Sequence, residues 1–476
     1  MSDAQVVVVG GGIAGLAAAA FLSGAAGVAA RARVTLLEAS GRIGGKLWGG
    51  EVGGVRVDLG AESVLARRPE AVDLARAVGL GEELEPPTTA KAAIWTRGAL
   101  RPLPGGQVMG VPGDLEALAA SGVLTDEGLE RARNERPGEI GEDVAIGRYV
   151  ADRLGQEVVD RLVEPLLGGV YAGRAEEISL RAAVPQLLSI ARGGGSLVEG
   201  VHELASRPKV AGTPVFQGLR GGLGTLPGAV AAACVKAGVD LRTDAPVDEL
   251  RRTPDGWRVV AGGEVLHADA VVLAVPAPVA ARLLREDAPA AATDLDAVEY
   301  AGMALVTLAF RRADLAEPPG GSGFLVPPVD GRRIKASTFS SNKWGWLERS
   351  APDAFLLRTS LGRYREEEAL GLPDEELVAR SLADLEEAIG LTARPYDTFV
   401  SRFTAGLPQY PVGHLDRVAR VRAQVARVGA LALCGAAYDG VGIPACIGSA
   451  AAAAAAVDRL LTPATGEGST ERTMGA

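Results

Sequence analysis

The chain has 476 residues, of which 47% are hydrophobic and only 4% aromatic. This length exceeds what one simple core organises, so we expect two or three structural units with cores built mainly from Ala, Val and Leu. A formal net charge of −10 at pH 7 argues against nucleic acid as a partner.

The N-terminus and the cysteines indicate a cytoplasmic protein. Asp3 passes directly into an apolar strand, which leaves no room for the basic region and cleavage site of a secretory leader. Cys234, Cys434 and Cys446 lack metal-ligand spacing, so we predict no metal site and expect buried thiols in a reducing compartment. The apolar stretch 431–461 is interrupted by an acid and repeated glycines. We therefore expect a helix packed on a sheet, and we leave peripheral membrane contact open.

Residues 6–9 are a run of valines that predicts a buried strand, and the alanine-rich segment beyond residue 12 predicts a helix. The glycines between them follow the G-x-G-x-x-G pattern. One glycine allows the tight turn, one lets a pyrophosphate approach the backbone, and one allows close packing of the helix. The free N–H groups and positive dipole end of the helix would face the phosphates. The pattern predicts a dinucleotide site, with contacts from Gly10, Gly12, Ile13, Ala14 and Gly15.

A second apolar strand over residues 34–37 ends at Glu38, where a ribose hydroxyl needs an acceptor. A further glycine loop with the sequence R-I-G-G-K follows at residues 42–46. A nicotinamide dinucleotide has no general need of such a loop, whereas a buried FAD runs on through the protein towards its flavin. The loop resembles the R-x-G-G-[RK] loop of flavoproteins of the amine-oxidase and porphyrinogen-oxidase type, so we expect FAD. The predicted contacts are Glu38, Ala39, Arg42, Gly44, Gly45 and Lys46.

Residues 57–63 close the first nucleotide-binding segment with small residues that allow the backbone to lie against a flavin ring. The segment 66–112 then mixes a helix with short strands and is expected to begin a substrate-binding domain. The cofactor contacts predicted in the first of these segments are Gly60, Ala61, Glu62 and Ser63.

From residue 113 to residue 207 the sequence is charged and helix-periodic, which predicts a helical subdomain. Its apolar face is illustrated by Leu154, Val158, Leu162 and Leu166.

Alternating strand and helix patterns over residues 215–290 return the chain to the nucleotide-binding domain, where Val247 is a further predicted cofactor contact. Strands dominate the first part of 294–417, and 463–476 are expected to form a disordered tail. The predicted fold class is α/β. It comprises a discontinuous Rossmann-like FAD-binding domain (1–65, 215–290 and 418–462), a mixed-sheet substrate domain (66–112 and 294–417) and the helical subdomain (113–207).

Near the C-terminus, a strand ends at Gly435, a glycine loop follows, and a helix begins near Ile443 with a proline in its first turn. A helix start aimed at a flavin would stabilise negative charge at the N1–C2=O end of the reduced ring. The predicted cofactor contacts here are Gly435, Val441, Gly442 and Ile443.

Four segments, at residues 58–63, 164–173, 221–227 and 434–449, resemble the oxygen-dependent porphyrinogen oxidases of haem biosynthesis. The resemblance runs over nearly the whole chain. Ala436 stands where amine oxidases carry an acid, a departure typical of that family. The resemblance implies non-covalent FAD and removal of six hydrogens from a porphyrinogen in three two-electron steps. Each step would pass a hydride to flavin N5, and O2 would reoxidise the flavin to give H2O2.

The resemblance also implies substrate contacts. It places Gly169 and Val170 against the substrate and matches Arg68 to a basic residue that holds a propionate, a role suited to an arginine. Lys335 and Lys343 are further candidates, with a solvated lysine as the alternative. No catalytic side chain is predicted, because hydride abstraction from an activated methylene bridge needs positioning more than acid–base help.

Two porphyrinogens compete as the substrate. The Ala-, Gly- and Arg-rich composition, the expected solubility and the polar helical subdomain favour coproporphyrinogen III over protoporphyrinogen IX. A flavin amine oxidase or carotenoid desaturase would share the block 10–46 but not the GVYAG segment at 169–173. A GDP-dissociation-inhibitor-like binding protein would share the glycine pattern without using a flavin. The expected partners are the porphyrinogen, O2 and haem-pathway enzymes such as ferrochelatase.

Overall fold

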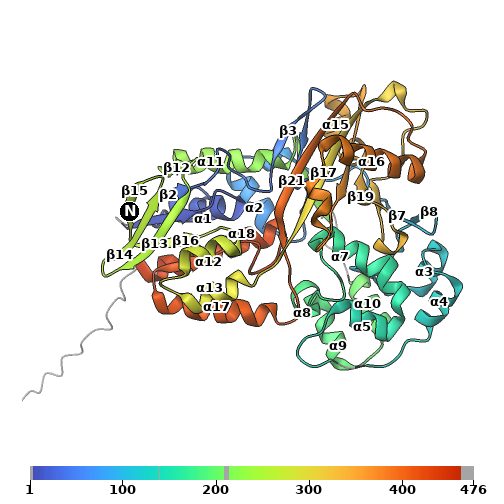
Figure 1. Ribbon diagram of the computed structural model, residues 1–476, viewed down its shortest axis with the longest axis horizontal. Coiled ribbons are helices and arrows are strands. Elements are labelled where there is room, and N and C mark those ends of the chain that lie inside the picture. Colours follow the sequence, from blue (N-terminus) through green and yellow to red (C-terminus); the bar gives the residue numbers. More distant parts are fainter. Residues whose placement is uncertain (1–3, 139, 208–213, 462–476) are drawn as a thin grey trace, which may run out of the picture.

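The computed structural model describes residues 4–138, 140–207 and 214–461, so the predicted tail at 463–476 lies outside the described residues. A parallel-sheet domain occupies one end of the molecule, and a mixed sheet and a helical subdomain lie together at the other end (Figure 1). The α/β fold class predicted from the sequence is confirmed.

The first sheet is parallel and has the strand order β12-β2-β1-β16-β22. It is assembled from three distant parts of the chain. Such sheets are covered on both faces, which explains the continuous apolar run of β1. The strands are β1 (Gln5–Val9), β2 (Arg33–Leu37), β12 (Asp240–Arg242), β16 (Ala270–Leu273) and β22 (Leu431–Leu433).

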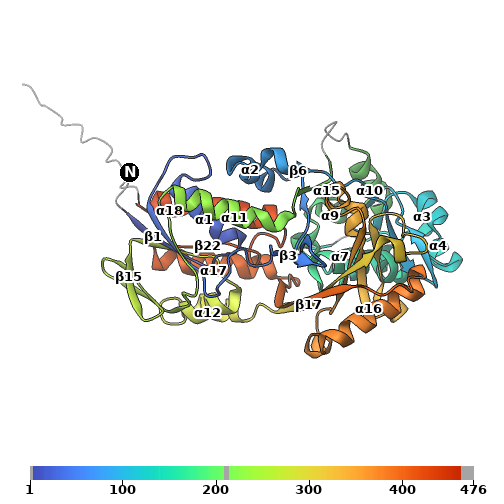
Figure 2. The same cartoon turned by 90° about the horizontal axis from the view of Figure 1, so that it is seen from above.

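Alternate valines of β1 pack into the hydrophobic cores on the two faces of the parallel sheet. Val6 and Val8 pack with one set of helices, and Val7 and Val9 pack with the other set and with a small antiparallel sheet (Figure 2). The first set is α1 (Ile13–Ser23), α2 (Glu70–Ala77), α11 (Leu226–Lys236) and α18 (Ile443–Leu461). The second set is α12 (Ala277–Leu284), α13 (Pro289–Asp296) and α17 (His414–Val428), with β13 (Val247–Thr253), β14 (Gly256–Ala261) and β15 (Glu264–Ala268).

Among the described residues, α18 is the one helix long and apolar enough to cross a membrane by length and composition. Half of that stretch is buried in the fold, where the helix packs against α1 and β22. A core helix passes the same test, so these properties carry no conclusion about a membrane.

The second sheet has seven strands in the order β21-β17-β20-β19-β18-β7-β8. It is mixed, because β18 pairs with β7 in parallel while the other neighbours are antiparallel. α16 (Asp374–Ile389) covers one face through an aromatic and aliphatic core. The strands are β7 (Ala92–Thr96), β8 (Ala99–Pro102), β17 (Tyr300–Arg311), β18 (Gly323–Leu325), β19 (Ile334–Thr338), β20 (Ala354–Leu361) and β21 (Asp397–Pro408).

The helical subdomain has its own apolar core, and a π turn, η2 (Val159–Val163), interrupts its apolar periodicity. Leu154, Val158 and Leu162 are fully buried as predicted. Beyond the π turn the buried position moves from Leu166 to Leu167, because such a turn inserts one residue into the helical repeat. The α-helices are α3 (Leu115–Ser121), α4 (Asp126–Arg133), α5 (Ile146–Leu154), α6 (Gln156–Val158), α7 (Glu164–Tyr171), α8 (Leu180–Ala183), α9 (Leu188–Gly193) and α10 (Leu197–Ser206).

Three predicted domain borders shift in the structure. α2 was expected in the substrate domain, but its apolar face packs into the nucleotide-domain core with α18. α13 crosses the border predicted at residue 290, and α17 crosses the one predicted at 417, since both helices cover the parallel sheet. The shorter elements that join the domains are β3 (Gly49–Val52), β4 (Val55–Asp58), β5 (Val64–Leu65), β6 (Leu84–Glu85), β9 (Gln107–Val108), β10 (Val111–Pro112), β11 (Phe216–Leu219), α14 (Ser340–Lys343) and α15 (Gly345–Ser350).

Candidate active site

A cavity of about 520 Å³ lies at the carboxyl ends of four neighbouring parallel strands. Its walls come from the residues that follow β1, β2, β16 and β22, and the substrate sheet contributes residues of β17 and β21. Ligands of open parallel sheets bind at this edge, and the volume is within the range of small-molecule sites.

Three glycines of the turn after β1 have different structural roles. Gly10 has a φ of +106°, and a side chain there would meet the backbone oxygen of Ala274. A Cβ on Gly15 would lie 1.8 Å from the Gly10 oxygen, so Gly15 permits the close packing of α1. A Cβ on Gly12 would meet no atom within 4 Å, and no side chain caps α1 at that position. The uncapped start of α1 therefore stays open to a phosphate.

Glu38 is held with its carboxylate in the cavity wall. The Gly11 amide donates to Oε2 at 2.7 Å, and the Ser40 amide and hydroxyl donate to Oε1 at 2.9 and 2.7 Å. These contacts orient both oxygens, which have lone pairs left for the hydroxyls of a ribose.

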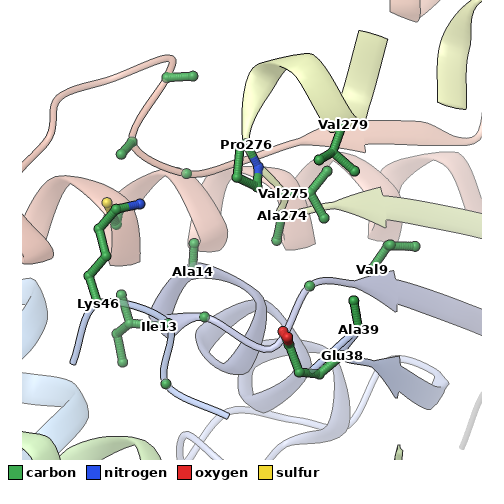
Figure 3. A pocket seen from close by; sticks show the side chains of 18 of the residues that line it. Val9, Ile13, Ala14, Glu38, Ala39, Lys46, Ala274, Val275, Pro276 and Val279 are labelled. Carbon is green, nitrogen blue, oxygen red and sulfur yellow. The ribbon is translucent and has the colours of Figure 1, made fainter. Parts of the chain in front are cut away.

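Lys46 lines the cavity and is largely buried, and burial lowers the pKa of its ammonium group. In the part of the chain that the structure describes, its ammonium group has no hydrogen bond or ion pair. Lys46 and Glu38 lie on either side of the start of α1, opposite residues 274–276 (Figure 3). A buried cation without a partner favours an anion in the cavity. The residues present therefore fit a dinucleotide with a diphosphate.

The loop after β22 is clamped from outside the cavity. The Tyr410 hydroxyl donates to the Ala436 oxygen at 2.5 Å and accepts from the Gly440 amide at 2.9 Å. His414 stacks on Tyr410 with ring centroids 3.9 Å apart, and its Nε2 lies 3.0 Å from the Ala437 oxygen. The clamp holds this loop against the cavity, which Ala436 and Ala437 line.

Most of the predicted cofactor residues meet in this one cavity. They are Gly10, Gly12, Ile13, Ala14, Glu38, Ala39, Gly44, Gly45, Lys46, Ala61, Val247, Gly435, Val441 and Ile443.

The other predicted cofactor residues do not line the cavity. Gly15 and Gly60 serve backbone packing, since a Cβ on Gly60 would lie 2.1 Å from the Lys46 oxygen. The Arg42 guanidinium donates to the Gly45 oxygen and covers the ring of Trp48. Gly442 lies at the start of α18 and accepts from the Cys446 amide, and Ser63 stands before β5 without a contact to the cavity.

Glu62 does not line the cavity, and its side chain forms ion pairs within the protein. It is buried, and it pairs with Lys343 at 2.7 Å and Arg358 at 2.9 Å. Burial raises the pKa of Glu62, but the charges of Arg358 and Lys343 outweigh it and lower the pKa to about 2. Glu62 thus joins β4 to the substrate sheet, and Lys343 is occupied by this pair.

The predicted substrate residues are dispersed. Arg68 does not line the cavity: its side chain is 46% exposed, pairs with Glu70 and lies in a separate surface groove along α18. Gly169 and Val170 are exposed on α7, where the Cβ position of Gly169 is 3.8 Å from Leu325. Lys335 is buried in β19 beneath that helix.

Several residues that line the cavity were not predicted from the sequence. Residues 274–276 follow the apolar strand β16 as Gly10 follows β1, and that parallel was a usable signal. Cys446 is buried, as expected of the three thiols, and it also lines the cavity. Tyr300 carried no local signal; its hydroxyl accepts from the Ala277 amide at 2.8 Å. The remaining missed residues include Val279, Arg282, Gly406 and Leu407.

The parallel sheet, the open glycine turn and the ribose acceptor define a dinucleotide-binding protein with an added substrate domain. The chain belongs to the flavin containing amine oxidoreductase family, whose model matches residues 13–458. It is therefore a flavin-dependent oxidoreductase, and the expectation of an enzyme rather than a non-enzymatic binding protein is confirmed.

Relatives resemble the chain over nearly its full length. A Mycobacterium leprae protein named coproporphyrinogen III oxidase is 39% identical, with 94% of this chain and 97% of that protein covered. A Mycobacterium tuberculosis protein of the same name is 38% identical, with 96% and 98% covered. The solved structure of an Exiguobacterium protein, provisionally named a protoporphyrinogen oxidase, is 34% identical with a TM-score of 0.85 and covers 96% of this chain and 99% of that one. These names confirm the resemblance to porphyrinogen oxidases.

Proposed function

We propose that this protein oxidises coproporphyrinogen III to coproporphyrin III, with FAD as its cofactor and O2 as the electron acceptor that is reduced to H2O2. The observation that carries the proposal is the full-length similarity to two mycobacterial proteins with the name coproporphyrinogen III oxidase. We further propose that it works in the cytoplasm and passes its product to later haem-pathway enzymes such as a ferrochelatase.

The cavity supports FAD as the particular flavin. Glu38 suits the hydroxyls of an adenosine ribose, and the open start of α1 suits a diphosphate. Lys46 supplies a buried positive charge for the diphosphate or the flavin end. The two thiols near the C-terminus support non-covalent binding. Burial raises the pKa of Cys446 to about 11 and raises that of Cys434 further, which leaves little nucleophilic thiolate for a bond to a flavin.

FAD, when bound, would supply a hydride acceptor, which takes up two electrons and one proton in each of the three oxidation steps. The chain's own contribution is positioning. The carbon to be oxidised must meet the flavin end of the cavity, which Ala61, Leu407 and Val441 line with apolar atoms. These three side chains are apolar and contribute no competing nucleophile. Within the described residues, the acids near this region are engaged elsewhere: Glu62 in ion pairs and Asp58 by the amides of Leu223 and Gly224.

The distinction between the two porphyrinogens depends on their side chains. Coproporphyrinogen III has four propionates, and protoporphyrinogen IX has two propionates and two vinyl groups. The mycobacterial names favour the first substrate, whereas the name of the Exiguobacterium protein favours the second. Protoporphyrinogen IX therefore stays the alternative.

Turnover of the two porphyrinogens by the purified protein tests the proposal. We expect porphyrin fluorescence and H2O2 to form faster with coproporphyrinogen III, and FAD to appear in the supernatant after acid precipitation. A preference for protoporphyrinogen IX would replace the proposed substrate. Peroxide formation from primary amines alone would indicate an amine oxidase instead.

A further inference from the structure

Lys335 is a buried cation that the fold leaves without a partner. It lies in β19 and is 8% exposed. Its ammonium group has no hydrogen bond or ion pair within residues 4–138, 140–207 and 214–461. An unpaired buried ammonium group is costly, so a protein keeps one only where an anion or a chemical task compensates it.

A second cation lies beside it. Arg363 follows β20 with a side chain 15% exposed, and its Nη2 donates to the Val326 oxygen at 3.3 Å. The Val326 amide in turn donates to the Lys335 oxygen at 2.9 Å, so the two cations flank one stretch of backbone. They repel each other, and this repulsion contributes to the pKa shift of Lys335.

The acids around this pair lie on the side of Arg363, and none forms an ion pair with Lys335 within the described residues. Glu366 is half-exposed and forms an ion pair with the Arg363 guanidinium at 3.8 Å. Glu164 of α7 accepts from the Ala175 amide at 2.7 Å. Asp384 of α16 accepts from the amides of Arg333 and Ile334 at 2.8 Å each. Both buried acids are thus held by backbone donors.

The position of the pair relates it to the substrate. α7 packs over β18 and β19 (Figure 1). At this contact the helix offers Gly169, whose Cβ position is 3.8 Å from Leu325 of β18. A Cβ on Gly168 would meet no atom within 4 Å. The two cations therefore lie by the strands that α7 covers, and the resemblance to porphyrinogen oxidases implies substrate contacts at Gly169 and Val170 of this helix.

We propose that Lys335 and Arg363 form a binding site for one carboxylate of the substrate, beneath α7. The proposal rests on the proposed function, because a porphyrinogen with propionate arms supplies the anion. An ammonium and a guanidinium group together give a carboxylate charge-assisted hydrogen bonds on both of its oxygens.

The pair gives substrate binding a particular pH dependence. Burial, followed by the repulsion of Arg363, lowers the pKa of Lys335 to about 7, while Glu366 acts in the opposite direction. Lys335 of the free protein is therefore charged below this pH and loses its charge above it. The KM for a carboxylate substrate should be flat below about pH 7 and rise above it.

The test compares coproporphyrin III with its tetramethyl ester, which has no carboxylate, as ligands of the flavin-loaded protein. We expect Lys335→Met to raise the Kd for coproporphyrin III by about tenfold to a hundredfold and to leave the Kd for the ester unchanged. Lys335→Arg should restore binding and abolish the rise of KM above about pH 7, because an arginine stays charged. Lys236→Met, an exposed lysine at the end of α11, is the matched control and should change neither quantity.

Glu366→Gln tests the competing explanation that Glu366 is the internal partner of Lys335. Because Glu366 raises the pKa of Lys335, the comparison is made well below pH 7, where Lys335 is charged with or without Glu366. Under the proposal this variant then binds coproporphyrin III at least as tightly as the wild type. A wild-type Kd in Lys335→Met, or an unchanged pH profile in Lys335→Arg, would overturn the proposal. Failure of the proposed function would differ, since no variant would then turn over coproporphyrinogen III while binding of the porphyrin could still be measured.

Discussion

Two clusters of buried charge join the substrate sheet to its neighbours, and they differ in balance. Towards the nucleotide-binding domain, Glu62 pairs with Lys343 and Arg358. Towards the helical subdomain, Arg363 has one half-exposed partner, Glu366 at 3.8 Å, and Lys335 has none within the described residues. We call the first cluster balanced because both of its cations contact the acid, and the second unbalanced because Lys335 contacts none. A balanced cluster stabilises a contact between domains without a ligand. An unbalanced cluster contains a buried charge that an anionic ligand would stabilise. The same kinds of side chain thus serve structure in one place and binding in the other.

The balanced cluster also acts on the cofactor site. The Arg358 guanidinium donates to the oxygens of Asp58 and Gly60 at 2.9 and 2.7 Å, just before Ala61 in the cavity wall. Glu62 and Arg358 are therefore positioning residues for this wall, and neither touches the cavity itself.

The largest effect should come from breaking the balanced cluster. Glu62→Gln leaves two buried cations without their carboxylate and should lower the free energy of unfolding by about 3 to 5 kcal/mol. Because the pKa of Glu62 in the folded protein is about 2, below its ordinary 4.5, its stabilisation is present above pH 4.5 and is lost as the pH falls.

Chemical unfolding followed by circular dichroism measures this loss. Glu348→Gln, which removes an exposed acid on α15, is the control and should stay within about 0.5 kcal/mol of the wild type. If Glu62→Gln lowers the free energy of unfolding by less than about 1 kcal/mol, these ion pairs are not a main stabilising contact between the two domains.

Removing a charge from the unbalanced cluster should instead raise the free energy of unfolding. In the folded protein the pKa of Lys335 is about 7, below its ordinary 10.5, so its charged form destabilises the fold. The penalty grows as the pH falls from 10.5 and is complete below about pH 7. Lys335→Met should therefore raise the free energy of unfolding at about pH 6, by about 2 to 3 kcal/mol more than at about pH 9.

Urea unfolding at the two pH values, without substrate, measures the difference. An equal change at both would mean that Lys335 does not titrate between them. With coproporphyrin III present the gain should shrink, because the bound carboxylate stabilises the wild-type ammonium group.

The smallest effect should come from Arg68. Its exposed pair with Glu70 contributes little, and it lies outside the cavity. Arg68→Ala should leave the KM, the FAD content and the melting temperature close to those of the wild type. A marked rise in KM, measured with either porphyrinogen, would restore Arg68 to the substrate site and weaken the case for Lys335.

The cofactor site was predictable because its geometry is local in the sequence. The turn from β1 to α1 depends on backbone freedom at Gly10 and on close approach at Gly15, and both are properties of residue type and spacing. Glu38 follows its strand directly, so the order of the elements placed it. Lys46 was found for the same reason.

The substrate side was less predictable because its contacts are not local. The partners of Glu62 come from α14 and β20, nearly three hundred residues away. No sequence pattern marks Arg363, which meets Lys335 only through the pairing of β18, β19 and β20. The π turn moved the buried position from Leu166 to Leu167, a shift that helical spacing does not anticipate.

By itself the sequence determined the cofactor class, the α/β fold and the family, since glycine spacing, apolar strands and turn residues act within short segments. Only the tertiary structure decided which charges are balanced. That Glu62 contacts two cations, that Arg68 is exposed and that Lys335 is buried depend on residues brought together from distant segments. Electrostatic energy depends on distance and desolvation in three dimensions, and neither quantity is encoded at any single position of the chain.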